Sequence, residues 1–128
     1  MSEKDITDRS DIELLVSDFY KKALIDPVIG YFFTKVIVLD LDVHLPRIID
    51  FWCSLLLGHS SFKGNPMVKH IALNRIEKIT DQHFNRWLSL WNLTVEEHFR
   101  GPQATEAMKR ADQIAGLMKH KINIDEML

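Results

Sequence analysis

Residues 44–70 read HLPRIIDFWCSLLLGHSSFKGNPMVKH, and this stretch decides the fold. Its apolar residues follow the i, i+3, i+4, i+7 spacing of a helix with a wide apolar face: Leu45, Ile48, Ile49, Trp52, Leu55 and Leu56. Asp40 and Asp42 are candidates for the N-cap of this helix, and Pro46 is tolerable in its first turn. Gly58 supplies the left-handed residue that ends it. The stretch therefore predicts a helix covered by other elements on most sides.

Two histidines, His44 and His70, bracket this apolar helix. An apolar slot flanked by two imidazoles suits a planar iron cofactor, because a neutral imidazole nitrogen is a good ligand for iron. A histidine beside an apolar helix is also common as an ordinary core or surface residue. The spacing alone leaves both interpretations open.

Composition narrows the class of protein. The chain of 128 residues is 46% hydrophobic and 27% charged, with a net charge of -2, which predicts one globular domain over residues 1–128 with loose ends at 1–9 and 122–128. The net negative charge does not suggest the basic surface that nucleic-acid binding requires. The single Cys53 argues against a disulfide framework, an iron–sulfur site or covalent haem attachment, and is expected to be a small buried hydrophobe. No signal peptide or membrane span is found, so we expect a cytoplasmic protein that does not insert into membranes.

The remaining pattern is helical. Ser10 and Glu13 form a capping-box signature before a first helix that ends at Asp26-Pro27. This helix carries Tyr20, whose ring is at the edge of the apolar stripe and whose hydroxyl needs a partner or a cavity. A short helix is expected at 67–73, a long one from Thr80 to Gly101-Pro102, and a last one at about 103–121. The apolar residues 36–38 are helical or irregular. The chain is therefore predicted to be all-α.

Several motifs, taken in order, resemble the truncated haemoglobins, and specifically their third group. They cover residues 11–118 and are Phe19-Tyr20, Asp26-Pro27, Gly30-Tyr31-Phe32-Phe33, His44 with Asp50-Phe51-Trp52 and Leu57-Gly58, Phe62-Lys63-Gly64-Asn65-Pro66-Met67, His83-Phe84-Asn85-Arg86-Trp87-Leu88, Arg110-Ala111 and Ile114-Ala115. The resemblance implies a shortened globin fold in which two helices pack on two around haem b.

The same resemblance implies a role for individual residues. His70 matches the proximal histidine that binds the iron, and the polar residues that face a bound ligand are Tyr20, His44 and Trp87. The positions expected against the haem are Phe33, Arg47, Ile48, Met67 and Phe84, where Arg47 can meet a propionate. Pro46, close behind His44, leaves open whether that imidazole points into the pocket or toward solvent. His83 is a competing proximal candidate.

These residues imply a haem protein that binds dioxygen and related diatomic ligands, nitric oxide and carbon monoxide. Hydrogen-bond donors near a partly negative bound dioxygen slow its release. The alternative is a haem enzyme, an NO dioxygenase or a peroxidase-like protein, which would depend on an external reductase; no catalytic residue is assigned for it. A third hypothesis is a haem-free helical module that binds a partner helix. His59, His98 and His120 are expected at the surface, and Trp91 is expected in the core.

Overall fold

The chain is entirely helical where its structure is described. The structure is a computed structural model that describes residues 4–36, 40–59, 73–74 and 78–127, with side chains described as far as residue 122. Within these ranges there is no strand, and the elements are α1 (Arg9–Ile25), the π-helix η1 (Phe32–Val36), α2 (Leu41–Leu57), α4 (Asp81–His98) and α5 (Pro102–Met127). The predicted all-α class is confirmed. His70 and Met67 lie outside the described residues, as does most of the expected helix at 67–73.

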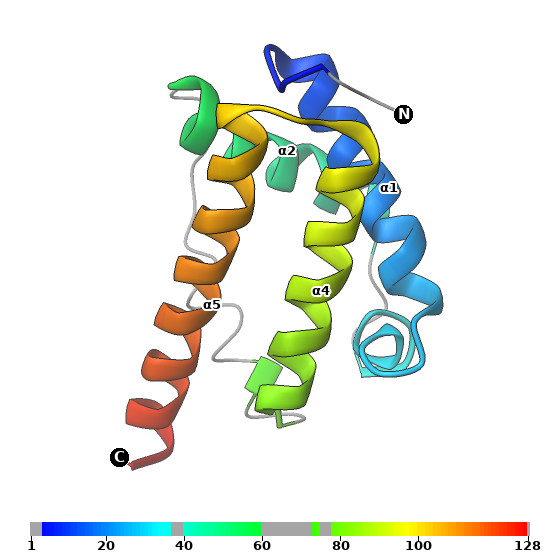
Figure 1. Cartoon of the computed structure of the whole chain (residues 1–128). Coiled ribbons are helices and arrows are strands. Elements are labelled where there is room, and N and C mark those ends of the chain that lie inside the picture. Colours follow the sequence, from blue (N-terminus) through cyan, green and yellow to red (C-terminus); the bar gives the residue numbers. More distant parts are fainter. Residues whose placement is uncertain (1–3, 37–39, 60–72, 75–77, 128) are drawn as a thin grey trace.

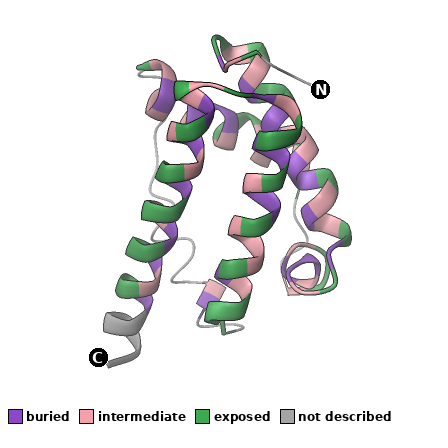
Figure 2. Cartoon of the chain, in the orientation of Figure 1, coloured by how far each residue is buried: buried purple, intermediate pink, exposed green. Residues whose placement is uncertain are grey.

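The helices form two pairs that pack on each other. Helices α4 and α5 run antiparallel side by side, and α1 contacts α2 (Figure 1). The pairs meet where α1 packs on α4 and α2 packs on α5. Buried positions follow one side of α4 and of α5, while exposed positions follow the opposite side (Figure 2). This is the expected two-on-two helical sandwich.

The ends of α2 and α4 follow from their capping residues. The Asp40 side chain accepts from the Asp42 N–H at the start of α2, and Gly58 ends this helix with a left-handed φ of 73°. At the start of α4, Thr80 and His83 form a reciprocal capping box. Three of these four signals were predicted from the sequence, whereas the part played by His83 was not. Pro46 lies inside α2 without ending it.

The predicted start of α1 is wrong in detail. The N-cap is Asp8, in extended conformation, and its side chain accepts from the Asp11 N–H at 3.2 Å. Ser10 instead donates to Asp8 Oδ1 at 2.6 Å, so its hydroxyl does not cap the helix through a box with Glu13. A carboxylate at position 8 is a stronger acceptor than the serine hydroxyl, which explains the shift.

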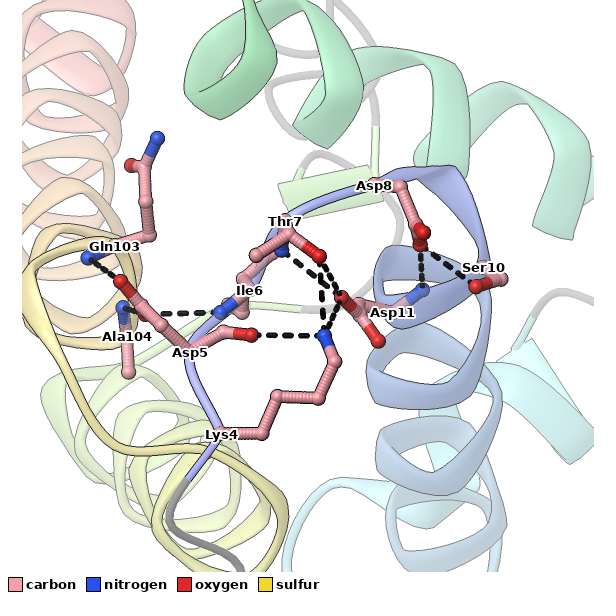
Figure 3. A network of polar contacts seen from close by, with 9 residues as sticks. All are labelled: Lys4, Asp5, Ile6, Thr7, Asp8, Ser10, Asp11, Gln103 and Ala104. Atoms are coloured by element: carbon pink, nitrogen blue, oxygen red, sulfur yellow. Dashed lines mark hydrogen bonds and ion pairs between the residues drawn. The ribbon is translucent and has the colours of Figure 1, made fainter.

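The described residues near both ends of the chain are held more firmly than the sequence suggests. Residues 1–9 were predicted to be loose, but in the described part of this segment the Asp5 carboxylate accepts from the N–H groups of Gln103 and Ala104 at 3.0 and 2.9 Å (Figure 3). Ile6 is only 1% exposed. At the other end, α5 continues to Met127 instead of stopping near residue 121, and Ile122 is buried. Asp5 thus caps α5 across the fold, a contact that leaves no local sequence signal.

One large apolar cluster joins all four α-helices. Trp91 and Cys53 lie inside it with exposed fractions of 1% and 0%, as expected for a core tryptophan and a small buried hydrophobe. A second, smaller cluster lies between α4 and α5 and consists of Phe84, Ala115, Met118 and Ile122. Trp87 packs against both clusters and so marks the boundary between them.

Candidate functional site

The first feature of the site is a polar pair formed between α1 and α2. The Tyr20 hydroxyl lies 2.7 Å from His44 Nε2, and the two rings meet edge to face with centroids 5.3 Å apart. The His44 imidazole therefore points inward to Tyr20, and Pro46 does not swing it into solvent. Tyr20 is 7% exposed, and burial raises its pKa, so the phenol stays protonated at neutral pH.

Aromatic and apolar side chains surround this pair. The Phe33 ring stands edge-on to Tyr20 at 5.8 Å between centroids, and Phe19 does so at 5.3 Å. Ile48 lies one helical turn after His44 and is partly buried against the core. Arg47, its neighbour on α2, is exposed. Together these residues place two polar groups among aromatic and apolar side chains, with a cation on the adjacent surface.

Trp87 on α4 reaches the same region through Phe19. The centroids of these two rings are 6.1 Å apart, and Phe19 is also the ring beside Tyr20. Trp87 donates no hydrogen bond to any described residue, and its indole N–H is not a buried unpaired atom within the described part of the chain. This donor is therefore open to a ligand or to solvent. By contrast, the Trp91 N–H is used inside the core, where it donates to the Ala107 carbonyl at 3.2 Å.

Phe84 lies apart from the Tyr20 group. It is buried in the second cluster, against α5, and Lys119 Nζ lies 5.7 Å from the centre of its ring. Phe84 is one helical turn before Trp87, so a large planar group beside Trp87 could still border both. The structure therefore brings Tyr20, His44 and Phe33 together directly, and Trp87 through a shared neighbour.

His83, the competing proximal candidate, is occupied by other partners. Its Nδ1 accepts from the Thr80 N–H at 2.9 Å, and its Nε2 lies 3.2 Å from the Tyr31 hydroxyl. An imidazole that binds iron must leave one nitrogen for the metal. Both ring nitrogens of His83 already have partners, which argues against His83 as a metal ligand.

The other histidines lie away from this group. His59 and His120 are exposed, as expected for surface residues. His98 is half-buried, and its Nε2 lies 2.7 Å from Asp18 Oδ2, so it is a helix-to-helix contact as well as a surface residue. With Glu97, these two residues place one potential metal ligand each within 4.8 Å of one another. Lys22 Nζ lies 2.7 Å from Asp18 Oδ2 and 3.3 Å from Glu97 Oε1, so an ammonium group already balances the carboxylates.

An ion pair between the buried Asp26 and the partly exposed Arg86 fixes the turn between α1 and η1. Arg86 Nε donates to Asp26 Oδ1 at 2.7 Å and Arg86 Nη2 lies 2.7 Å from the same oxygen, while Asp26 Oδ2 accepts from the Val28 and Ile29 N–H groups. Burial alone would raise the pKa of Asp26, but these hydrogen bonds hold it below the usual range. The pair ties the end of α1 to α4, directly before Trp87. Sequence reasoning missed it because the two residues are far apart in the chain.

The described helices form a two-on-two helical sandwich with a buried Tyr20–His44 pair between α1 and α2. No protein-family model matches the chain. The chain is 26% identical over 110 residues to the group 3 truncated hemoglobin ctb of Campylobacter jejuni, which covers 84% of each sequence. Its fold matches the crystal structure of a group III truncated hemoglobin from Campylobacter jejuni with a TM-score of 0.81, 24% identity and 94% of each chain covered.

Both comparisons confirm the resemblance drawn from the sequence motifs. The chain has the fold of the truncated haemoglobins and resembles their third group in sequence. Among the described residues, no helix combines the length and the apolar character that crossing a membrane requires.

Proposed function

We propose that the chain is a globin-type haem protein that binds dioxygen and the related diatomic ligands nitric oxide and carbon monoxide. The proposed cofactor is haem b, with His70 as the axial ligand of the iron. The proposal is supported by the truncated-globin fold and by the Tyr20–His44 pair, which places hydrogen-bonding groups among aromatic and apolar side chains.

The described residues fit such a cofactor. A haem needs flat apolar surfaces for the porphyrin, a cation near solvent for a propionate, and space for a ligand beside the iron. Phe33 and Ile48 offer the apolar surface, and the exposed Arg47 offers the cation. When bound, the haem supplies an iron whose open axial position takes a diatomic gas.

The chain's own part in the chemistry is to stabilise the ligand by hydrogen bonds. A hydroxyl group has one hydrogen to donate, and it can accept as well. If His44 carries its proton on Nε2, it donates to the Tyr20 oxygen and leaves the Tyr20 hydrogen free for the ligand. Because burial keeps Tyr20 protonated, that hydrogen is present over the whole physiological pH range. The Trp87 N–H is a second available donor.

Absorption spectroscopy tests the proposal. Purified chain reconstituted with haem should give the Soret bands of a histidine-ligated globin in its ferric, ferrous and carbonyl forms. The His70→Gly variant should lose the histidine-ligated spectrum and recover it when free imidazole is added. His59→Gly makes the same substitution at an exposed histidine and should leave the spectra unchanged. The proposal would be ruled out by a reconstituted chain without a Soret band, or by a spectrum that does not change in His70→Gly.

A further inference from the structure

The chain contains three tryptophans, and the structure stacks all of them in one array. Trp87 and Trp91 on α4 lie nearly parallel, with 12° between their planes and 6.4 Å between their centroids. Trp91 and Trp52 on α2 are stacked more closely, at 21° and 4.5 Å. The array therefore leads from the wall of the candidate haem site, through the core, to α2.

The three indoles occupy different positions along the array and would have different roles in electron transfer. Trp87 borders the site, where its N–H is free of protein partners in the described chain. Trp91 is fully enclosed, and its N–H is bonded to the Ala107 carbonyl, so it has no water nearby to which a proton could be lost. Trp52 is 3% exposed and lies edge-on to the half-buried Phe51, one side chain from the surface.

The array differs from the phenylalanines around it in its redox chemistry. Stacked and edge-to-face pairs are both common in protein cores, and Phe19 meets Trp87 and Trp91 edge to face. The centroids of the successive indole rings lie 6.4 and 4.5 Å apart, which is a short distance for electron transfer. Indole and phenol lose a single electron far more readily than the phenylalanine ring does. The three tryptophans therefore form a continuous path of oxidisable rings in the described core, and Tyr20, which contacts Phe19, is the competing electron donor.

We propose that Trp87, Trp91 and Trp52 conduct single electrons from the surface of α2 to the candidate haem site, for the reduction of a hydroperoxide. This rests on the proposed function, because the bound haem supplies the place where the O–O bond breaks. Hydrogen peroxide takes up two electrons and two protons and becomes two waters. Two phenol donors supply them, and each becomes a phenoxyl radical.

Each electron crosses the array in the same order. Trp87 gives an electron toward the peroxide, Trp91 replaces it, and Trp52 replaces the electron lost by Trp91. A phenol at the surface then restores Trp52. Because Trp91 keeps its N–H bond to Ala107, it acts as a relay, and the oxidising equivalent reaches Trp52, the last ring of the array, next to the half-buried Phe51.

The test treats the haem-loaded chain with hydrogen peroxide in the absence of phenol. Electron paramagnetic resonance should then show a tryptophanyl radical, and peptide mass spectrometry should find oxidised Trp52. The Trp91→Phe variant keeps an aromatic ring in the core but removes the relay, so oxidation of Trp52 should be lost while oxidation of Trp87 persists. In Trp52→Phe the radical should stay on Trp91 and Trp87. Phe51→Leu changes the packing on Trp52 without removing an indole and should leave Trp52 oxidation in place.

The outcomes separate this inference from the proposed function. A haem-loaded chain with a normal Soret band, but with a radical on Tyr20 and intact Trp52, overturns the electron path and leaves haem binding standing. Equal oxidation of Trp52 in wild type and Trp91→Phe, or in haem-free chain, means that peroxide reaches Trp52 directly and also overturns it. Absence of a Soret band in the wild-type chain overturns both the electron path and the proposed haem binding. Protection of Trp52 from oxidation when phenol is present during the peroxide treatment supports the direction of electron flow.

Discussion

Two buried polar side chains, both near the end of α1, differ in how completely they are bonded. Asp26 accepts three hydrogen bonds, one from Arg86 Nε and two from backbone N–H groups, and Arg86 Nη2 makes a further ion-pair contact at 2.7 Å. Tyr20, at 7% exposure, has one partner among the described residues, His44. A carboxylate has about four acceptor positions, so Asp26 is saturated, whereas a phenol bonded once retains capacity for another partner.

This difference in hydrogen bonding indicates which buried polar groups stabilise the fold and which remain available to a ligand. A saturated group has nothing further to offer, and removing it leaves its former partners unpaired in the interior. An unsaturated group contributes less to the fold and can bind something that arrives later. Asp26 is accordingly assigned to stability and Tyr20 to ligand binding.

The largest expected effect is on ligand release in Tyr20→Phe. Loss of a hydrogen bond to a partly charged ligand costs about 1.5–3 kcal/mol, so the oxygen dissociation rate constant should rise roughly 10- to 150-fold. Stopped-flow displacement of oxygen from the haem-loaded protein measures it. Tyr31→Phe is the matched control, because its hydroxyl faces His83 instead of His44. Equal oxygen dissociation rates in Tyr20→Phe and wild type would show that Tyr20 does not bind the ligand, and would contradict its separation from Asp26.

Asp26→Ala, in contrast, should lower the free energy of unfolding. It leaves the two backbone donors and the Arg86 side chain without their buried acceptor, and we expect a loss of about 2 kcal/mol in the free energy of unfolding. Denaturant unfolding measures this loss. The oxygen dissociation rate should change much less than in Tyr20→Phe. A variant as stable as wild type would show that saturation of Asp26 contributes little to the fold.

Asp5 extends the comparison to a half-buried carboxylate that accepts backbone hydrogen bonds. Its carboxylate accepts from the first N–H groups of α5, in the manner of an N-cap residue (Figure 3). Asp5→Ala should therefore lower the free energy of unfolding by about 1 kcal/mol, the usual cost of losing such a cap. Asp112→Ala, at an exposed position of α5, is the control. Equal stabilities of the two variants would mean that residues 4–9 do not support α5.

The smallest effect is expected at the contact between Asp18 and His98. Side-chain hydrogen bonds from Lys22 and His98 lower the pKa of Asp18 below the ordinary aspartate value of 3.8. Because the folded pKa is the lower one, this stabilisation is present above pH 3.8 and is lost as the pH falls through the folded value. Asp18→Asn should cost under about 1 kcal/mol near neutral pH, since the pair is partly exposed.

The decisive feature of this last prediction is that the stability difference between Asp18→Asn and wild type should disappear in acid. Denaturant unfolding at several pH values measures it, with Asp112→Asn as the control. A difference that stays constant down to the acid transition would assign the effect to packing, because a lost charge interaction must follow the ionisation of Asp18.

Local signals in the sequence were enough to predict most of the helices. The caps at Asp40, Gly58 and Thr80 are properties of a few neighbouring residues, and the burial of Trp91 follows from helical spacing. The start of α1 was misplaced because two possible caps, Asp8 and Ser10, compete within one turn. The sequence prediction ended α5 at about residue 121. No strong stop signal stands there, and the helix continues to Met127.

Contacts between distant residues could not be predicted in the same way. The Asp26–Arg86 pair and the Asp5 cap join segments that no local pattern connects. Tyr20 and His44 were both singled out from the sequence, but their direct contact and the inward direction of His44 depend on how α1 packs on α2. The position of Trp91 between Trp87 and Trp52 likewise depends on the crossing of α4 with α2.

The most direct test of the ligand-binding role of Tyr20 is the infrared C–O stretching frequency of the carbonyl form. A hydrogen bond donated to the bound ligand draws electron density onto it and lowers this frequency. Tyr20→Phe should therefore raise the frequency, while Asp26→Asn should leave it unchanged. An identical frequency in wild type and Tyr20→Phe would show that the phenol does not reach the ligand, and would contradict the role assigned to it.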